Sequence, residues 1–426
     1  MSRNVPKLRF KGFEDEWKEY RLGDFLDFYS TNSLSRDCLN SEDGEVQNIH
    51  YGDIHMKFPT ILDIQKYDLP FINSDIDISK IKDDSFCRDG DIVIADASEN
   101  YDDIGKSIEV ENISNNKVVA GLHTILCRDN KNMTANGFKG YMLSNEYIRK
   151  QIKVLAVGTK VLGISKTNLS TIKTNMPSLQ EQEKIANFLS KLDSIIEKQE
   201  KKVEYWNLYK KGMMQKIFKQ EIRFKDDKGL DYPEWKKMTL GDVDVELTRG
   251  PFGSALKKEF MVDKGIETYK VYEQKHAIQK NIKIGEYYIN KEKYNKLKRF
   301  KVNPGDFIMS CSGTVGELFK IPNNAEKGVI NQALLKIEVG SKVNEEYFLY
   351  CFRKNLDGLE TKGSGIKNIT SVKFLKEEFI MPIPFLKEQE KIGDFFVKID
   401  AILDKEYKKL EELKHLKKGL LQQIFI

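Results

Sequence analysis

The feature that most constrains the fold is a segment that occurs twice in the chain. Residues 181–218 and 388–425 are identical at 19 of 38 aligned positions, where unrelated segments would share about two. Shorter phrases also recur, as in Leu22-Gly23-Asp24 with Leu240-Gly241-Asp242, Gly90-Asp91 with Gly305-Asp306, and Gly158 with Gly363. The stretches between are much less alike. The sequence therefore predicts two variable globular parts and two similar connecting parts.

The connecting parts have the pattern of long helices. Pro177 and Pro384 stand just before them, where proline is tolerated, and no proline follows in either segment. With Leu189 and Leu192 at heptad positions a and d, eight of eleven seam positions are apolar in each copy. A seam of this length predicts a coiled coil, and the two copies are natural partners for each other. We expect the helix pair to be held together by Leu189, Leu192, Ile196, Phe396, Ile399 and Leu403.

Two alternatives stay open for these helices. Each could be an amphipathic helix that packs on its own domain. The polar seam residues Gln199 and Lys210 could set the register of the pair, or their side chains could extend out of the seam to solvent.

The globular parts contain short apolar runs that follow turns. Residues 91–95 and 306–310 predict buried strands, and residues 118–127 and 328–339 predict further strands. The fold class is therefore α+β: two similar α/β domains and two long helices that form a coiled coil, with an internal repeat.

Composition narrows the functional class. No run approaches the roughly 18 apolar residues of a membrane helix, and the N-terminal sequence lacks a signal-peptide pattern, so we expect a cytoplasmic protein. The five cysteines are scattered and form no CxxC pair. Of the net charge of +5, residues 1–175 contribute 23 Lys+Arg against 27 Asp+Glu. A DNA-binding surface in that part would have to be a local basic patch.

Common catalytic signatures are missing. Gly105-Lys106-Ser107 resembles the end of a phosphate-binding loop, but Asn100 stands where the loop needs glycine. No Pro-Asp, Asn-Pro-Pro or Asp-Pro-Pro phrase is present, and the five histidines have no metal-site spacing. We therefore expect no catalytic residue, no metal site and no cofactor in this chain.

Together these features resemble the specificity (S) subunits of type I restriction-modification systems. The resemblance rests on the two Leu-Gly-Asp phrases, the two Gly-Asp strands and the phrase Pro-x-Leu-x-Glu-Gln-x-Lys-Ile at 177–185 and 384–392. Residues 312–316 with 331–334 also match the family's recognition-domain core, whereas Gly121-Leu122-His123 in the first half departs from it. The resemblance covers essentially the whole chain.

The resemblance implies a division of the chain and a set of partners. Residues 1–175 and 221–380 would be target-recognition domains that each read half of a bipartite site in double-stranded DNA. Residues 176–220 and 381–426 would be the conserved helical regions, which would separate the two domains as an antiparallel coiled coil and give the chain a pseudo-twofold repeat. Modification subunits, two in number, would supply S-adenosylmethionine, and restriction subunits would supply ATP- and Mg²⁺-dependent translocation and cleavage. No membrane partner is implied.

Residue chemistry suggests which side chains meet DNA. Basic residues contact phosphates, whereas Asn and Gln suit adenine and Lys suits guanine. The candidate DNA-binding residues are Lys298, Arg299, Lys301, Gln274, Lys275, Asn331 and Gln332 in the second half, and His50, Tyr51, Lys160 and Lys166 in the first. Two other functions stay open, namely a self-contained DNA modification enzyme with disguised motifs and a coiled-coil assembly protein without a DNA role.

Overall fold

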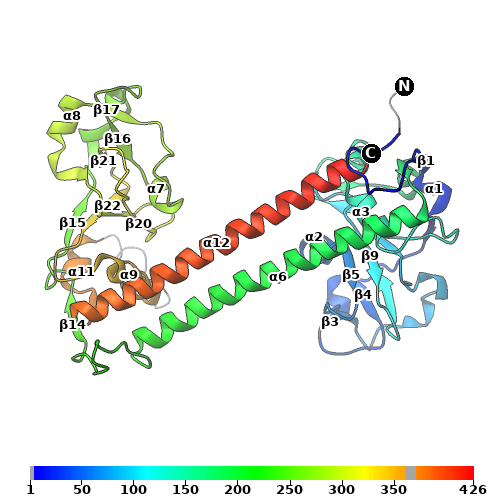
Figure 1. The fold of residues 1–426 in the computed structure, drawn as a ribbon, viewed down its shortest axis with the longest axis horizontal. Coiled ribbons are helices and arrows are strands. Elements are labelled where there is room, and N and C mark those ends of the chain that lie inside the picture. The colour runs from blue at the N-terminus through cyan, green and yellow to red at the C-terminus, as the bar shows by residue number, and fades with distance from the viewer. Residues whose placement is uncertain (1–3, 361–370) are drawn as a thin grey trace. The chain divides into compact units, whose positions relative to one another are not determined.

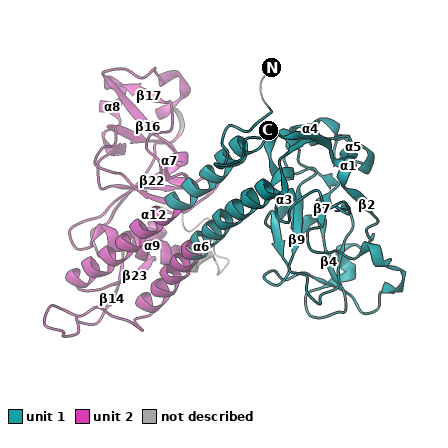
Figure 2. Ribbon diagram, turned by 45° about the vertical axis from the view of Figure 1, so that its right-hand side comes forward, with its two compact units in different colours: residues 1–201, 408–426 teal, residues 202–407 magenta. Residues whose placement is uncertain are grey.

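The computed structural model describes residues 4–360 and 371–426, so the repeat counterpart at Gly363 lies outside the described residues. Contacts divide the chain into two compact units, residues 1–201 with 408–426 and residues 202–407 (Figure 2). The long helices are α6 (Leu179–Phe218) and α12 (Leu386–Ile424) (Figure 1), and each contributes one end to each unit (Figure 2). Each unit thus consists of one globular domain, the start of one long helix and the end of the other.

The first unit contains two main sheets. A five-stranded sheet has the order β2-β11-β7-β9-β5, and a four-stranded sheet has the order β10-β4-β6-β3. Their bounds are β2 (Asp27–Tyr29), β3 (Leu39–Asn40), β4 (Gln47–Ile49), β5 (Ile61–Asp63), β6 (Phe71–Ile72), β7 (Ile92–Ala95), β9 (Ser107–Glu111), β10 (Val118–Ala120) and β11 (Thr124–Arg128). Two-stranded pairs are formed by β1 (Lys18–Arg21) with β13 (Lys173–Met176) and by β8 (Ala97–Ser98) with β12 (Leu162–Gly163). The helices are α1 (Leu22–Phe25), α2 (Tyr51–Met56), α3 (Phe138–Ser144), α4 (Glu146–Leu155) and α5 (Lys166–Ser170).

The second unit repeats this plan with fewer strands. One sheet has the order β15-β22-β19-β20, and the other has the order β17-β16-β21-β18. The strands are β14 (Lys236–Thr239), β15 (Glu246–Arg249), β16 (Thr268–Tyr272), β17 (Tyr288–Asn290), β18 (Lys301–Val302), β19 (Phe307–Ser310), β20 (Leu318–Lys320), β21 (Gly328–Ile330), β22 (Leu334–Glu338) and β23 (Ile380–Ile383). The helices are α7 (Gln274–Ile278), α8 (Lys291–Lys296), α9 (Glu345–Glu360) and α11 (Val372–Glu377).

The predicted strands are present in both units. The Gly-Asp strands are β7 and β19, and all four residues of each are buried. The runs at 118–127 and 328–339 each divide into two strands around a turn, at residues 121–123 and 331–333. The α+β class and the antiparallel helix pair are confirmed.

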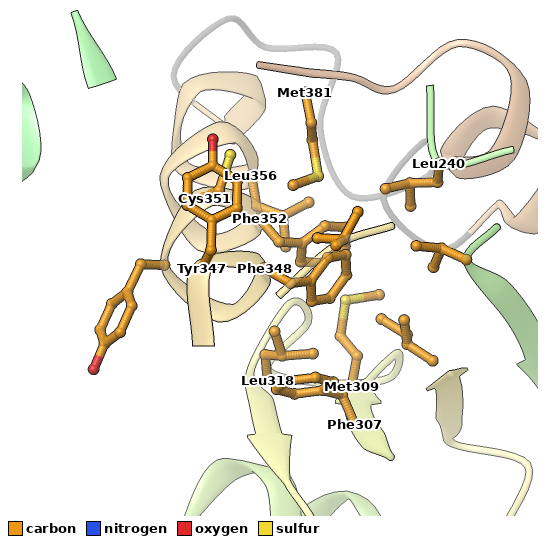
Figure 3. Packing of buried hydrophobic residues seen from close by; sticks show 14 of the residues in the cluster. Leu240, Phe307, Met309, Leu318, Tyr347, Phe348, Cys351, Phe352, Leu356 and Met381 are labelled. Carbon is orange, nitrogen blue, oxygen red and sulfur yellow. The ribbon is translucent and has the colours of Figure 1, made fainter. Parts of the chain in front are cut away.

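The core of each unit includes the end of the long helix that arrives from elsewhere in the chain. In the second unit, Ile217 near the end of α6 and Phe396 near the start of α12 join the cluster under β19 and α9. Figure 3 shows part of this cluster, with labelled side chains Leu240, Phe307, Met309, Leu318, Tyr347, Phe348, Cys351, Phe352, Leu356 and Met381. In the first unit, Ile424 and Phe425 at the end of α12 join Phe138 and Leu189 in the equivalent cluster. The phrase Ile-Phe therefore recurs because each copy completes a core.

Candidate nucleic-acid interface

The repeated Glu-Gln phrase attaches each long helix to its globular domain. Glu181 accepts two hydrogen bonds of 2.8 Å from Arg9, and Glu388 accepts bonds of 3.1 and 2.7 Å from Arg223. The glutamines act in parallel: Gln182 accepts from the backbone N–H of Ala135, and Gln389 accepts from that of Asn344, both at 2.9 Å. These glutamines occupy seam positions in the heptad pattern, but their buried side chains hydrogen-bond to the domains.

A second contact occurs in both units: an aspartate on one long helix contacts a lysine on the other long helix and a tyrosine of the globular domain. Asp193 pairs with Lys417 at 2.6 Å and accepts a 2.9 Å hydrogen bond from the Tyr141 hydroxyl. Asp400 pairs with Lys210 and accepts a 2.6 Å hydrogen bond from the Tyr350 hydroxyl. Burial raises the pKa of both phenols, so the hydroxyls stay protonated as donors.

These contacts are relevant to the alternatives left open for the long helices, namely packing on a domain and the role of the polar seam residues. Within each unit α6 and α12 run antiparallel, as the ion pairs Lys414–Glu200 and Lys202–Glu406 also show at 2.8 Å each. Lys210 is ion-paired, so its side chain does not extend freely to solvent. The six expected helix-pairing residues, Leu189, Leu192, Ile196, Phe396, Ile399 and Leu403, are all at most 8% exposed.

In the first unit, two candidate residues lie where two parallel strands end. Strands β4 and β10 are parallel, with Ile49 opposite Ala120, so their carboxyl ends share one sheet edge. His50 follows β4 and caps α2, where its Nδ1 accepts a 3.1 Å hydrogen bond from the N–H of Gly52. Tyr51 lies beside it, with ring centroids 4.6 Å apart. Burial lowers the pKa of His50, which favours the neutral ring that this cap requires.

The turn after β10 adds His123, which is not among the candidates predicted from the sequence. The ring of His123 lies 5.4 Å from that of Tyr51 in an edge-on contact. In the sequence, His123 belongs to the phrase that departs from the family pattern. Its place in the turn after β10, which is equivalent to the turn after β21, is the signal that identifies it.

The two first-half lysines make no ring contact with His50, Tyr51 or His123. Lys166 is exposed, and its Nζ donates a 2.8 Å hydrogen bond to the carbonyl of Tyr29. Lys160 is exposed in the hairpin that precedes β12. Both can reach a ligand, but neither belongs to the ring cluster of His50, Tyr51 and His123.

In the second unit the same architecture gathers four candidates. Strands β16 and β21 are parallel, with Tyr272 opposite Ile330. Gln274 and Lys275 begin α7 after β16, while Asn331 and Gln332 form the turn after β21. Lys275 pairs with Glu273 at 2.9 Å, and Gln332 is exposed. Parallel pairing therefore brings together two pairs of residues that are more than 50 positions apart in the chain.

The three remaining basic candidates form a separate group. Lys298, Arg299 and Lys301 line a cavity of about 540 Å³ together with β15, β22 and α11. Lys336 and Lys376 also line this cavity and add two more ammonium groups. Glu246 and Glu338 are its two acidic residues, so positive side chains outnumber negative ones. Excess positive charge of this kind suits phosphate oxygens. The lining contains none of the four residues at the ends of β16 and β21.

Across residues 4–360 and 371–426, no three His, Cys, Asp or Glu side chains are grouped so as to hold a metal ion. Within the same residues, no helix has the length and apolar content needed to cross a membrane.

Comparisons with known proteins place this architecture in a family. The model of the type I restriction modification DNA specificity domain matches residues 14–205 and again 232–415. Two curated relatives come from Methanocaldococcus jannaschii. The MjaX specificity subunit is 26% identical over 71% of this chain and 70% of its own length. The type I restriction enzyme MjaVIII specificity subunit is 27% identical over 49% of this chain and 46% of its own length.

Solved structures share the fold over nearly the whole chain. The S subunit of the type I restriction-modification system from M. genitalium superposes with a TM-score of 0.56 at 16% identity, covering 99% of both chains. A chain from a structure of type I R-M complex assembly and conformational transition gives a TM-score of 0.52 at 16% identity, covering 97% of this chain and 98% of that one.

The fold and the matches define a two-domain specificity protein. The chain belongs to the type I restriction-modification DNA specificity family and contains two copies of its domain, which confirms the resemblance seen in the sequence.

Proposed function

We propose that this chain is the DNA-reading subunit of a type I restriction-modification enzyme. Each target-recognition domain reads one half of a bipartite site, and the chain itself carries out no chemistry. Modification subunits, two per chain, supply S-adenosylmethionine and methylate adenine. Restriction subunits supply ATP- and Mg²⁺-dependent cleavage, and the assembly works in the cytoplasm.

One observation carries this proposal: both units present the same strand-end architecture with different side chains. At the ends of the parallel strands the first unit has His50, Tyr51 and His123, whereas the second has Gln274 and Asn331. A shared scaffold with different polar groups is what two independent base-reading surfaces require. The cavity lined by Lys298, Arg299 and Lys301 supports phosphate contacts in the second half.

The test is methylome sequencing of cells that carry the chain with its modification subunit. The expected result is one bipartite motif with a fixed gap. Exchange of residues 26–150 for the matching part of a related subunit should change one half of that motif. A motif changed in both halves, or in neither, would contradict the proposal.

The other two functions have distinct signatures. A self-contained modification enzyme would methylate DNA as the purified chain alone. A coiled-coil assembly protein would show no salt-dependent mobility shift of DNA when the modification subunit is present.

A further inference from the structure

The turns that follow β10 and β21 occupy the same place in the repeated fold. Each turn begins with a backbone hydrogen bond to the end of the neighbouring parallel strand and ends with one to the strand beyond. These bonds are Gly121 N–H to Ile49 O at 3.0 Å and Asp96 N–H to His123 O at 3.0 Å in the first unit, and Asn331 N–H to Tyr272 O at 2.9 Å and Cys311 N–H to Ala333 O at 2.8 Å in the second. His123 is therefore the structural counterpart of Ala333.

The backbone holds His123 in an unusual conformation. Its φ is +54°, a left-handed value that a non-glycine residue adopts only at a cost in free energy. The side chain nevertheless remains 51% exposed. A strained residue that leaves half of its ring open gains little from packing, so its position calls for another reason.

Neighbouring groups orient the imidazole. Its Nδ1 lies 3.5 Å from a carboxylate oxygen of Asp96, at the end of β7. Tyr51 contacts the ring from α2, and Tyr51 is itself flanked by His50 and, at 6.0 Å, by His55. With Nδ1 facing the Asp96 carboxylate, Nε2 is the ring nitrogen left to act as an acceptor. An acceptor at this point fits the amino group that adenine or cytosine presents in the major groove.

We propose that His123 reads the amino edge of an adenine or a cytosine in one half-site, with Asp96 and Tyr51 as the residues that position its ring. This inference deepens the function proposed above and rests on it. The second unit has no equivalent contact, because Ala333 has only a methyl group. Its half-site is read by other groups.

The experiment uses the full chain assembled with its modification subunit, with methylome sequencing as the readout. His123→Ala removes the ring, and His123→Gly does so while relieving the left-handed backbone, so that loss of folding cannot explain both results. Both variants should relax one base position about 10-fold or more, in one half-site only. Asn331→Ala, in the other unit, should affect the opposite half-site. His415→Ala, which removes an exposed histidine on α12, should leave the motif unchanged.

Two substitutions of Asp96 distinguish a role in positioning the His123 ring from a merely structural role. Asp96→Asn keeps an oxygen that can accept a hydrogen bond from the Nδ1–H group, so it should retain the base preference, whereas Asp96→Ala should relax the same position as His123→Ala. An unchanged motif in both His123 variants would overturn the inference while leaving the proposed function intact. A relaxed position in the half-site that Asn331→Ala affects would overturn it too. A wild-type assembly that yields no bipartite motif would refute the proposed function itself and this inference with it.

Discussion

The contact between Glu388 and Arg223 provides the sharpest test of how the long helix is anchored. The Glu388 side chain is 0% exposed and accepts two hydrogen bonds from Arg223 and a 3.0 Å bond from the Trp235 indole. Removal of one partner from a buried pair costs about 3–5 kcal/mol. Glu388→Gln keeps one acceptor oxygen, so the expected loss in the free energy of unfolding is about 2–3 kcal/mol.

The assay is urea denaturation followed by tryptophan fluorescence, since Trp206 and Trp235 both report on the second unit. Lys391→Ala is the matched control on the same helix, because its pair with Asp227 is exposed and should leave the midpoint near the wild-type value. A double-mutant cycle with Arg223→Ala isolates the coupling between the two side chains. If Glu388→Gln were no worse than the control, or the coupling were zero, the anchoring argument would be wrong.

Three further predictions follow from other contacts. Leu192→Asp with Ile399→Asp buries two unpaired carboxylates and should cost about 3 kcal/mol or more at each site; unchanged urea midpoints would exclude the paired-helix model. Burial raises the pKa of Asp306 to about 6, above its unfolded value near 3.9. Stability from this group is therefore fully present below about pH 4 and is lost as the pH rises to about 6. Asp306→Asn should remove that decline, which is up to about 3 kcal/mol and is measured by thermal unfolding. Substitution of the three basic residues in 298–301 by alanine should reduce the number of counterions released on DNA binding by up to about three, as measured from the salt dependence of the affinity, without changing the methylated motif. An altered motif would show that these residues read bases.

The sequence predicted the elements that depend on local pattern. The heptad row needed only spacing, and the runs at Gly90-Asp91 and Gly305-Asp306 needed only a turn followed by apolar residues. Both signals act within a few residues, so no tertiary context is needed to see them.

The site required contacts that no local pattern encodes. Gln274 and Asn331 come together only because β16 and β21 pair in parallel, and nothing in either strand specifies that partner. Likewise, Gln182 is apparent from its spacing as a seam residue, but its hydrogen bond to Ala135 depends on how the domain packs. His123 was not predicted as a candidate from the sequence, because the residues that contact its ring, Tyr51 and Asp96, are distant in sequence.

Each unit contains the end of a long helix that begins in the other unit, and this affects the order in which the units can fold during synthesis. Phe425 packs against Trp17 and Phe138, with ring centroids 6.3 and 5.6 Å away, and the N–H of Leu8 bonds to the carbonyl of Gln423 at 3.0 Å. Residues 1–201 therefore lack part of their core until residues 408–426 have left the ribosome, whereas residues 202–407 form a continuous stretch. At roughly 5–20 residues per second, the N-terminal domain waits on the order of ten to fifty seconds for its final helix turns. Within residues 1–426, the unit that begins first is thus the one completed last.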